Sequence, residues 1–461
     1  MKIRPALTLV AAVALAGCGA ARTDPPVAPS PDLPVPAVGA VVLVRPSADL
    51  PLPGAAARAQ VDGAIAQLQS DPRNQSALLS LGYAAYQLAR ETADPTEYAR
   101  AEEAFTTALV DDPTNLDATL GLGTIALARH DFAHGLELGQ QAELLAPRSA
   151  RVFGILGDGL VELGRYDESL AAVQRMVDLR PDLGSYARVS YQRELHGNLD
   201  GAIDAMEQAV LAGGPAVENT EYLRVILGNL WFIAGDLDHA QGAYQASLDA
   251  DPGYVFAMAG LARVAAARGD LDGSIAHWRQ AADRVPFPEF LIGLGETQEA
   301  AGHADDATAT YQLVRDIEAL FAANGVRTDL EMALFEADHG HPAQAVALGR
   351  IAYADTPNVK AADALGWALY RAGALDEART MAESAVRLGS LEPSYAYHLG
   401  MIAKAQGDDA AARLWLARSL ARNADWSPLH APLAAAALAE LGDGPVASPA
   451  PIVTPSPTEV P

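Results

Sequence analysis

The chain contains very little cysteine and very little lysine for its length. Among 461 residues Cys18 is the one cysteine, which excludes an internal disulfide and a zinc site built on several cysteines. Lysine occurs only at Lys2, Lys360 and Lys404, and acidic residues outnumber basic ones by 58 to 32. The formal net charge is therefore −26. A chain this acidic repels phosphate backbones, so we expect no nucleic-acid partner.

Aromatic residues are also scarce, at 6% of the chain, whereas apolar residues as a whole reach 50%. Alanine and leucine dominate the apolar set, and both favour helices over strands. The apolar content is sufficient for a large buried core. A length of 461 residues exceeds one ordinary compact domain, so several domains or a repeat array are expected.

The first residues have the pattern of a targeting segment. Lys2 and Arg4 precede an apolar run over residues 6–16, which is shorter than the roughly 20 residues that span a bilayer. The run ends in Leu15-Ala16-Gly17-Cys18, which resembles the lipobox of bacterial lipoproteins. That resemblance implies a signal peptide over residues 1–17, acyl chains such as palmitate on Cys18, and membrane anchoring in the cell envelope outside the cytoplasm. The alternative is a plain secretory signal with an incidental cysteine.

Two proline-rich segments flank the central part of the chain. Residues 18–54 are interpreted as the lipidated cysteine followed by a tether, because closely spaced prolines favour extended polyproline conformations over packing. Residues 442–461 are again rich in proline, serine and threonine and are predicted to be a disordered tail. The folded part is therefore expected over residues 55–441.

Within residues 55–441 one pattern recurs about every 34 residues. Pro113, Pro147 and Pro181 are spaced by 34, and a small residue stands twelve positions before each of them. A second column pairs a large apolar residue with a small one: Leu81-Gly82, Leu122-Gly123, Leu156-Gly157, Leu227-Gly228, Leu261-Ala262, Leu294-Gly295, Met332-Ala333, Leu365-Gly366 and Leu399-Gly400. Turns such as Gly235-Asp236 separate the two columns. The period identifies a repeat protein.

Each repeat is interpreted as two antiparallel helices. Small residues let the two backbones approach, a glycine-aspartate turn joins the helices, and proline ends the second helix. One such hairpin cannot bury its apolar face alone, so neighbouring hairpins must stack. The first helices are expected to begin near Gln75, Leu116, Ala150, Leu183, Glu221, Val255, Pro288, Val326, Val359 and Pro393. A leading helix over residues 55–70 and a closing helix over residues 429–441 complete the array.

These columns resemble the tetratricopeptide-repeat family. The resemblance implies an all-α fold: a right-handed α-solenoid of about ten helix-turn-helix repeats plus a C-terminal closing helix. It also implies an open, curved rod whose first helices line a concave groove. The pattern departs from the family near residues 213–220 and 318–330, where we expect irregular stacking and joints between rigid blocks.

The groove gives the candidate binding residues. Aromatic side chains flanked by cations are typical of a binding hot spot for an extended peptide. The residues projected onto this face are Asn229, Arg263, Lys360, Asp363, Trp367, Tyr370, Tyr397, Met401 and Lys404. The alternative is that some of these aromatic residues pack between repeats. The identity of a protein or peptide partner stays open.

No motif indicates catalysis, a metal or a cofactor. Gly121-Leu122-Gly123 lies inside a predicted helix rather than after a strand, which argues against a dinucleotide site. His339 and His341 are interpreted as solvated residues of a turn. We therefore expect no catalytic residue, no metal site and no cofactor, and a lipid-anchored extracytoplasmic scaffold for protein or peptide binding. The alternative function is a small-molecule or glycan-binding accessory module of an envelope assembly or secretion system.

Overall fold

The computed structural model describes residue 50, residues 52–214 and residues 217–444. All regular structure in these residues is α-helical, with no strand among them. After the leading helix α1 (Ala55–Ser70), ten helical hairpins follow one another and α22 closes the array. The all-α solenoid of helical hairpins predicted from the sequence is confirmed.

We number the hairpins repeats 1 to 10. They are α2 (Gln75–Thr92) with α3 (Thr96–Asp111), α4 (Leu116–Ala128) with α5 (Phe132–Leu145), α6 (Ala150–Glu162) with α7 (Tyr166–Leu179), α8 (Leu183–Leu195) with α9 (Leu199–Ala212), α10 (Val217–Ala234) with α11 (Leu237–Ala250), α12 (Val255–Ala267) with α13 (Leu271–Arg284), α14 (Pro288–Ala300) with α15 (Ala304–Ala323), α16 (Asp329–His339) with α17 (Pro342–Asp355), α18 (Val359–Arg371) with α19 (Leu375–Ala385), and α20 (Pro393–Ala405) with α21 (Asp409–Leu420); α22 is His430–Leu441.

Local sequence explains most helix starts. The first helices begin at the predicted residues in every repeat except two, where α10 begins at Val217 and α16 at Asp329. Asparagine caps several of them: the Asn74 side chain accepts a hydrogen bond from the Ala77 amide at 3.0 Å. Asn358 accepts one from Ala361 at 2.8 Å in the same way. Such caps satisfy amides that have no partner within the helix.

The small-residue column makes room for aromatic rings. The Phe105 ring lies between α2 and α4, where a Cβ added to Gly82 would be 2.5 Å from it and one added to Gly121 would be 2.3 Å from it. Tyr244 occupies the equivalent place between α10 and α12, again facing a glycine from each. The glycines are therefore required by the rings that the second helices insert between successive first helices.

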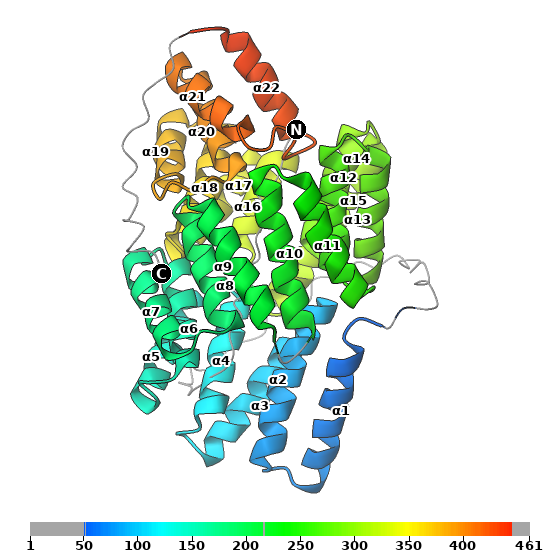
Figure 1. Ribbon diagram of the computed structural model, residues 1–461, viewed down its shortest axis with the longest axis vertical. Coiled ribbons are helices and arrows are strands. Elements are labelled where there is room, and N and C mark those ends of the chain that lie inside the picture. Colours follow the sequence, from blue (N-terminus) through cyan, green and yellow to red (C-terminus); the bar gives the residue numbers. More distant parts are fainter. Residues whose placement is uncertain (1–49, 51, 215–216, 445–461) are drawn as a thin grey trace, which may run out of the picture.

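The array coils far enough to touch itself. Figure 1 shows the helices passing from α1–α4 at one end to α20–α22 at the other, with later helices running close to α6–α10. We call the contact between the two turns the seam. Along it the helix-helix turns of repeats 2 to 5 meet the links that follow repeats 7 to 10. The expectation of an open rod is therefore wrong, because the rotation accumulated over the repeats brings the second turn onto the first.

The seam also holds a segment that we expected to be a joint. After α15, the Arg327 amide donates to the Arg129 carbonyl at 3.1 Å, and His130 Nδ1 lies 2.7 Å from the Arg327 carbonyl oxygen. The other expected joint precedes α10, and residues 215–216 there lie outside the described residues. At the start of α10, Glu218 forms an ion pair with Arg90 of α2 at 2.9 Å. Contacts from repeats 1 and 2 therefore fix both regions.

Candidate functional site on the inner face

The predicted binding residues are found on the inner helices, but several are enclosed. Asp363 and Tyr397 are 1% exposed and Trp367 is 2% exposed. Tyr370 and Met401 are half-buried and pack against the same apolar cluster. The stacking of α18 on α20 covers these aromatic residues. Trp367 and Tyr397 therefore pack between repeats, which was the alternative interpretation of the sequence. A partner reaches neither ring in this conformation.

The two predicted cations are engaged within the chain. Lys360 lies across the seam from repeats 3 and 4, where its Nζ is 2.9 Å from Glu162 of α6 and 5.1 Å from the centre of the Tyr191 ring of α8. Lys404 pairs with Glu440 of α22. One lysine therefore joins the two turns and the other holds the closing helix on α20.

Asn229 and Arg263 do come together, on α10 and α12. Asn229 Oδ1 accepts hydrogen bonds from the Tyr244 hydroxyl at 2.7 Å and from the Arg263 guanidinium at 2.9 Å. The guanidinium also lies over the Phe232 ring, 4.8 Å from its centre. These contacts fix the direction of Arg263, so its charge is presented to the interior in one orientation.

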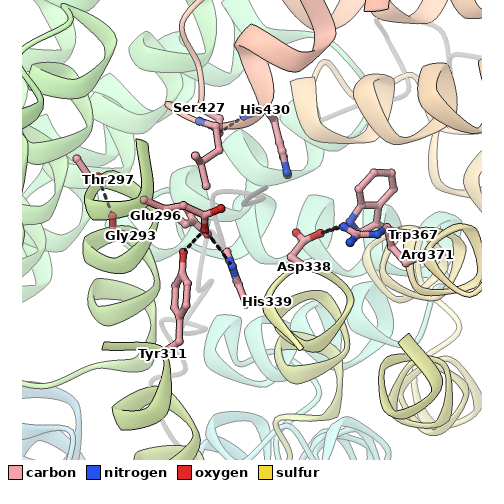
Figure 2. A network of polar contacts seen from close by, with 12 residues as sticks. Gly293, Glu296, Thr297, Tyr311, Asp338, His339, Trp367, Arg371, Ser427 and His430 are labelled. Carbon is pink, nitrogen blue, oxygen red and sulfur yellow. Dashed lines mark hydrogen bonds and ion pairs between the residues drawn. The ribbon is translucent and has the colours of Figure 1, made fainter. Parts of the chain in front are cut away.

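A polar network runs through the interior beside these residues (Figure 2). The indole nitrogen of Trp367 donates to Asp338 of α16 at 2.5 Å. Arg371 reaches the same carboxylate at 3.4 Å. The Asp338 side chain is only 5% exposed, and these two contacts give its carboxylate an opposite charge and a hydrogen-bond donor. Trp367 acts here as a hydrogen-bond donor between repeats 8 and 9.

The prediction that His339 is solvated is wrong. Its side chain is 3% exposed, and the ring stacks on Tyr311 with centres 4.0 Å apart. His339 lies 3.6 Å from Glu296 and 3.7 Å from Glu299, both on α14. The Tyr311 hydroxyl donates to Glu299 at 3.0 Å, and burial raises the pKa of this tyrosine. Only His341, whose side chain is 82% exposed, fits the interpretation as a solvated turn residue.

A second buried histidine explains the position of Asp363. His398 Nδ1 lies 2.9 Å from Asp363, and both side chains are 1% exposed. The His398 ring also stacks on Trp367 with centres 4.2 Å apart. Asp363 of α18 therefore links repeat 9 to repeat 10 through its contact with His398 of α20.

The inner face carries one feature that the sequence analysis missed. Between α21 and α22 the chain runs without helix from Ala421 to Leu429, which we call the cover segment. Its Asn423 side chain donates to the Phe232 carbonyl of α10 at 2.9 Å. Trp426 is 8% exposed and packs with Tyr397, at 6.0 Å between ring centres. A signal was present in the sequence, because an aromatic residue stands in a stretch that lacks helical periodicity.

A cavity remains where the cover segment meets the inner helices. The space inside it that a water-sized molecule can reach is about 50 Å³, and the cavity is open to solvent. Its walls come from α10, α12, α13, α14, the start of α20 and the cover segment, with Phe232, Arg263, Glu296, Glu392 and Trp426 among the lining residues. Apolar walls with a few convergent polar groups are typical of a binding site.

Two carboxyl groups near this region are shifted toward their protonated forms. Burial raises the pKa of Glu392, which lines the cavity, to about 7. Burial and the nearby charge of Glu392 raise the pKa of Glu194 of α8 to about 7, while Lys360 opposes the shift. The two acids belong to different turns of the superhelix, so the contribution of Glu392 to the pKa of Glu194 acts across the seam.

The described residues hold no group of three or more His, Cys, Asp or Glu side chains arranged to bind a metal ion. Across the same part of the chain, no helix has the length and apolar character needed to cross a membrane. The buried carboxylates and histidines named above contact one another or an arginine, a tyrosine or a tryptophan. The arrangement is therefore suited to holding helices together and to binding.

The predicted lipidation residue Cys18, the tether up to residue 49 and the tail from residue 445 lie outside the described residues.

Comparison with known proteins gives relatives that share the repeat. A family model described as tetratricopeptide repeat matches residues 88–150, 155–218, 259–319 and 364–428. A TPR repeat-containing protein of Treponema pallidum is 26% identical over 42% of this chain and 27% of that protein. Cellulose synthase 1 operon protein C of Komagataeibacter xylinus is 26% identical over 61% of this chain and 19% of that protein. The chain thus spans about a quarter or less of the length of these curated relatives.

Solved structures of other proteins also match parts of the chain. A human IFIT1 dimer with PPP-AAAA matches with a TM-score of 0.46 and 16% identity, over 72% of this chain and 78% of that one. A thermophilic TPR protein from Thermus thermophilus matches with a TM-score of 0.35 and 21% identity, over 45% of this chain and 98% of that one. The repeat model covers more than half of the sequence, and the chain belongs to the tetratricopeptide repeat family.

Proposed function

We propose that this protein is a lipid-anchored, extracytoplasmic scaffold that binds partner proteins through extended segments on its inner face. Tetratricopeptide repeat proteins generally mediate protein–protein interactions and are typically non-catalytic. The anchor is proposed because the one cysteine of the chain, Cys18, stands where a lipobox places it. Acyl chains on Cys18 would hold the array at a membrane, and residues 19–54 would give it reach.

The observation that carries the binding role is the position of the cover segment. A non-helical stretch of this chain, made of turns and bends, already lies on the inner helices, with Asn423 bonded to the backbone of α10 and Trp426 inserted among aromatic residues. The inner face of repeats 5 to 7 therefore has the shape and polarity to hold a non-helical polypeptide segment. Side-chain pockets plus a hydrogen bond to the main chain are a recurring mode of peptide recognition.

The anchor is tested by comparing the wild type with Cys18→Ser in bacterial cells. The wild type should incorporate a palmitate analogue and fractionate with membranes, whereas the variant should do neither. Equal labelling of both proteins, or an unlabelled wild type, would contradict lipidation at this residue.

Partner binding is tested by placing a photo-crosslinking residue at one inner and one outer position of the full chain. Met401 is half-buried on α20, and Leu144 on α5 is 86% exposed. The scaffold role predicts a discrete protein adduct from position 401 that is absent from position 144. Identical adducts from both positions, or none from position 401, would contradict binding on the inner face.

A further inference from the structure

The cover segment is attached to the inner face by two side chains. Asn423 donates to the Phe232 carbonyl, and Trp426, three residues later, packs with Tyr397 and His430. Asn423 Oδ1 also accepts a hydrogen bond from the Asp425 amide at 3.0 Å, which shapes the backbone between the two anchors. Arg422, Ala424 and Asp425 are exposed. An amide side chain and an aromatic ring therefore make the specific contacts.

The fit of this segment is incomplete. Trp426 is 8% exposed, yet its indole nitrogen has no hydrogen-bond partner among the described residues. The Nε atom of Arg263, which lines the same cavity, also has no hydrogen-bond partner among the described residues. A buried donor without an acceptor costs about 1–3 kcal/mol, so the closed arrangement stores a penalty that a better ligand would remove. Both atoms are donors, which calls for a ligand rich in carbonyl oxygens, as a peptide backbone is.

The closing helix contacts the cover segment at its start, where the Ser427 hydroxyl accepts a hydrogen bond from the His430 amide at 3.0 Å, but it also has contacts that do not involve this segment. Lys404 pairs with Glu440, and Arg413 of α21 donates to the Leu441 carbonyl at 2.9 Å. Ala431, Ala434 and Ala437 are buried on the same side of α22. When the segment leaves the inner face, α22 loses its Ser427 cap and the contact of Trp426 with His430, but its contacts with α20 and α21 remain.

We propose that the cover segment occupies the subsite of a partner peptide and is displaced when that partner binds. This inference rests on the proposed scaffold function and names the partner class: a non-helical segment that turns between an asparagine or glutamine and an aromatic residue three positions later. The partner is not strongly acidic, because the chain carries a net charge of −26 and Glu296 and Glu392 line the cavity. Binding competes with an intramolecular segment, so uncovering the site raises the apparent affinity.

The test uses a fluorescent peptide with the sequence Arg422–His430 as probe. The protein is the full chain with Cys18→Ser, compared with the same chain in which residues 421–429 are replaced by nine glycine and serine residues. Fluorescence anisotropy should show at least about tenfold tighter probe binding to the replaced link, because the intramolecular competitor is lost. A probe in which alanine replaces both the asparagine and the tryptophan is the matched control and should bind to neither protein.

Equal probe binding by the two proteins, or no binding to a replaced-link chain that retains the parent's circular dichroism, overturns the inference.

A second measurement covers the case in which the replaced link unfolds the array. In the Cys18→Ser background, Ser427→Cys and Ser394→Cys each give one thiol at a residue that is 4% or 0% exposed. Displacement predicts that a maleimide modifies position 427 at least about tenfold faster than position 394, by local opening. Equal rates overturn it. Palmitate labelling and in-cell crosslinking test the scaffold function, whereas probe binding and maleimide modification test displacement. A failure of one proposal can therefore be distinguished from a failure of the other.

Discussion

The hydroxyl of Tyr166 accepts a hydrogen bond at 2.8 Å from the backbone amide of Val359, which lies 193 residues further along the chain. Beside it, the Asn358 side chain donates to the Glu162 carbonyl at 2.8 Å. Both donors belong to the start of α18 and both acceptors to the turn region of repeat 3. These bonds join successive turns of the superhelix, and the last contact of the same seam places the cover segment over the inner face.

Glycines of the seam should be more sensitive to alanine than equivalent glycines elsewhere. A Cβ on Gly164 would lie 2.5 Å from the Pro357 carbonyl oxygen, and one on Gly235 would lie 2.0 Å from that of Arg422. Gly164→Ala and Gly235→Ala should therefore reduce the free energy of unfolding by the cost of a left-handed alanine, about 1 kcal/mol, plus about 1–3 kcal/mol for separating the turns. Urea unfolding followed by circular dichroism measures the loss.

The matched control is Gly269→Ala. Gly269 has φ 79°, close to the 71° of Gly164, but an added Cβ there meets nothing within 4 Å. This variant carries the backbone penalty without the clash. If it is destabilised as much as Gly164→Ala, the contact between turns contributes nothing.

Stability should fall as the pH rises toward neutrality. Burial raises the pKa of both Glu194 and Glu392 from an ordinary value of 4.5 to about 7. Between these values the folded protein binds more protons than the unfolded chain, so the free energy of unfolding decreases as pH rises from about 4.5 and levels off above about 7. Each group contributes a slope of up to roughly 1 kcal/mol per pH unit.

Glu194→Gln and Glu392→Gln remove the titrating protons while keeping most of the shape. Each variant should flatten this part of the stability profile, measured by urea unfolding between about pH 4.5 and pH 8. An unchanged slope in both variants would show that these carboxyls titrate normally in the folded protein.

Trp367 should behave as a core residue. Trp367→Ala should cost about 3–5 kcal/mol, because it leaves a cavity between repeats and removes the indole donor from the buried Asp338 carboxylate. Trp367→Phe keeps most of the ring and loses the hydrogen bond to Asp338, so about 1–3 kcal/mol is expected. Trp415→Ala is the comparison, since that residue is half-buried and its loss should be smaller. Equal losses for the two alanine variants, measured by urea unfolding, would contradict the buried role of Trp367.

The sequence was sufficient for the helices because each repeat is specified locally. Asparagine caps, glycine turns and the proline that ends a second helix all act within one hairpin, and their 34-residue spacing reveals the array. The extended α15 was also foreseeable, since no proline closes that repeat. The starts of α10 and α16 were misplaced because both follow links that depart from the repeat pattern.

The seam and the cover segment could not be derived in this way. Small rotations add up from repeat to repeat, and their sum decides whether one turn reaches the next. The total rotation of the array cannot be derived from any single residue of the sequence. Lys360 was therefore assigned to an open groove, although it forms an ion pair with Glu162. Trp367 matched a groove anchor and a packed core residue equally well until the position of Asp338 was known.

The account depends most on the contact between turns, and crosslinking across the seam tests it directly. In a Cys18→Ser chain, Glu162→Cys combined with Lys360→Cys places two thiols where an ion pair of 2.9 Å now joins repeats 3 and 9. A short bis-maleimide should link them within one chain, whereas Glu162→Cys with Lys404→Cys should stay unlinked, because Lys404 faces Glu440. Efficient linkage of the first pair alone is the predicted result. Failure of that pair to link, or equal linkage of both pairs, would contradict the closed superhelix.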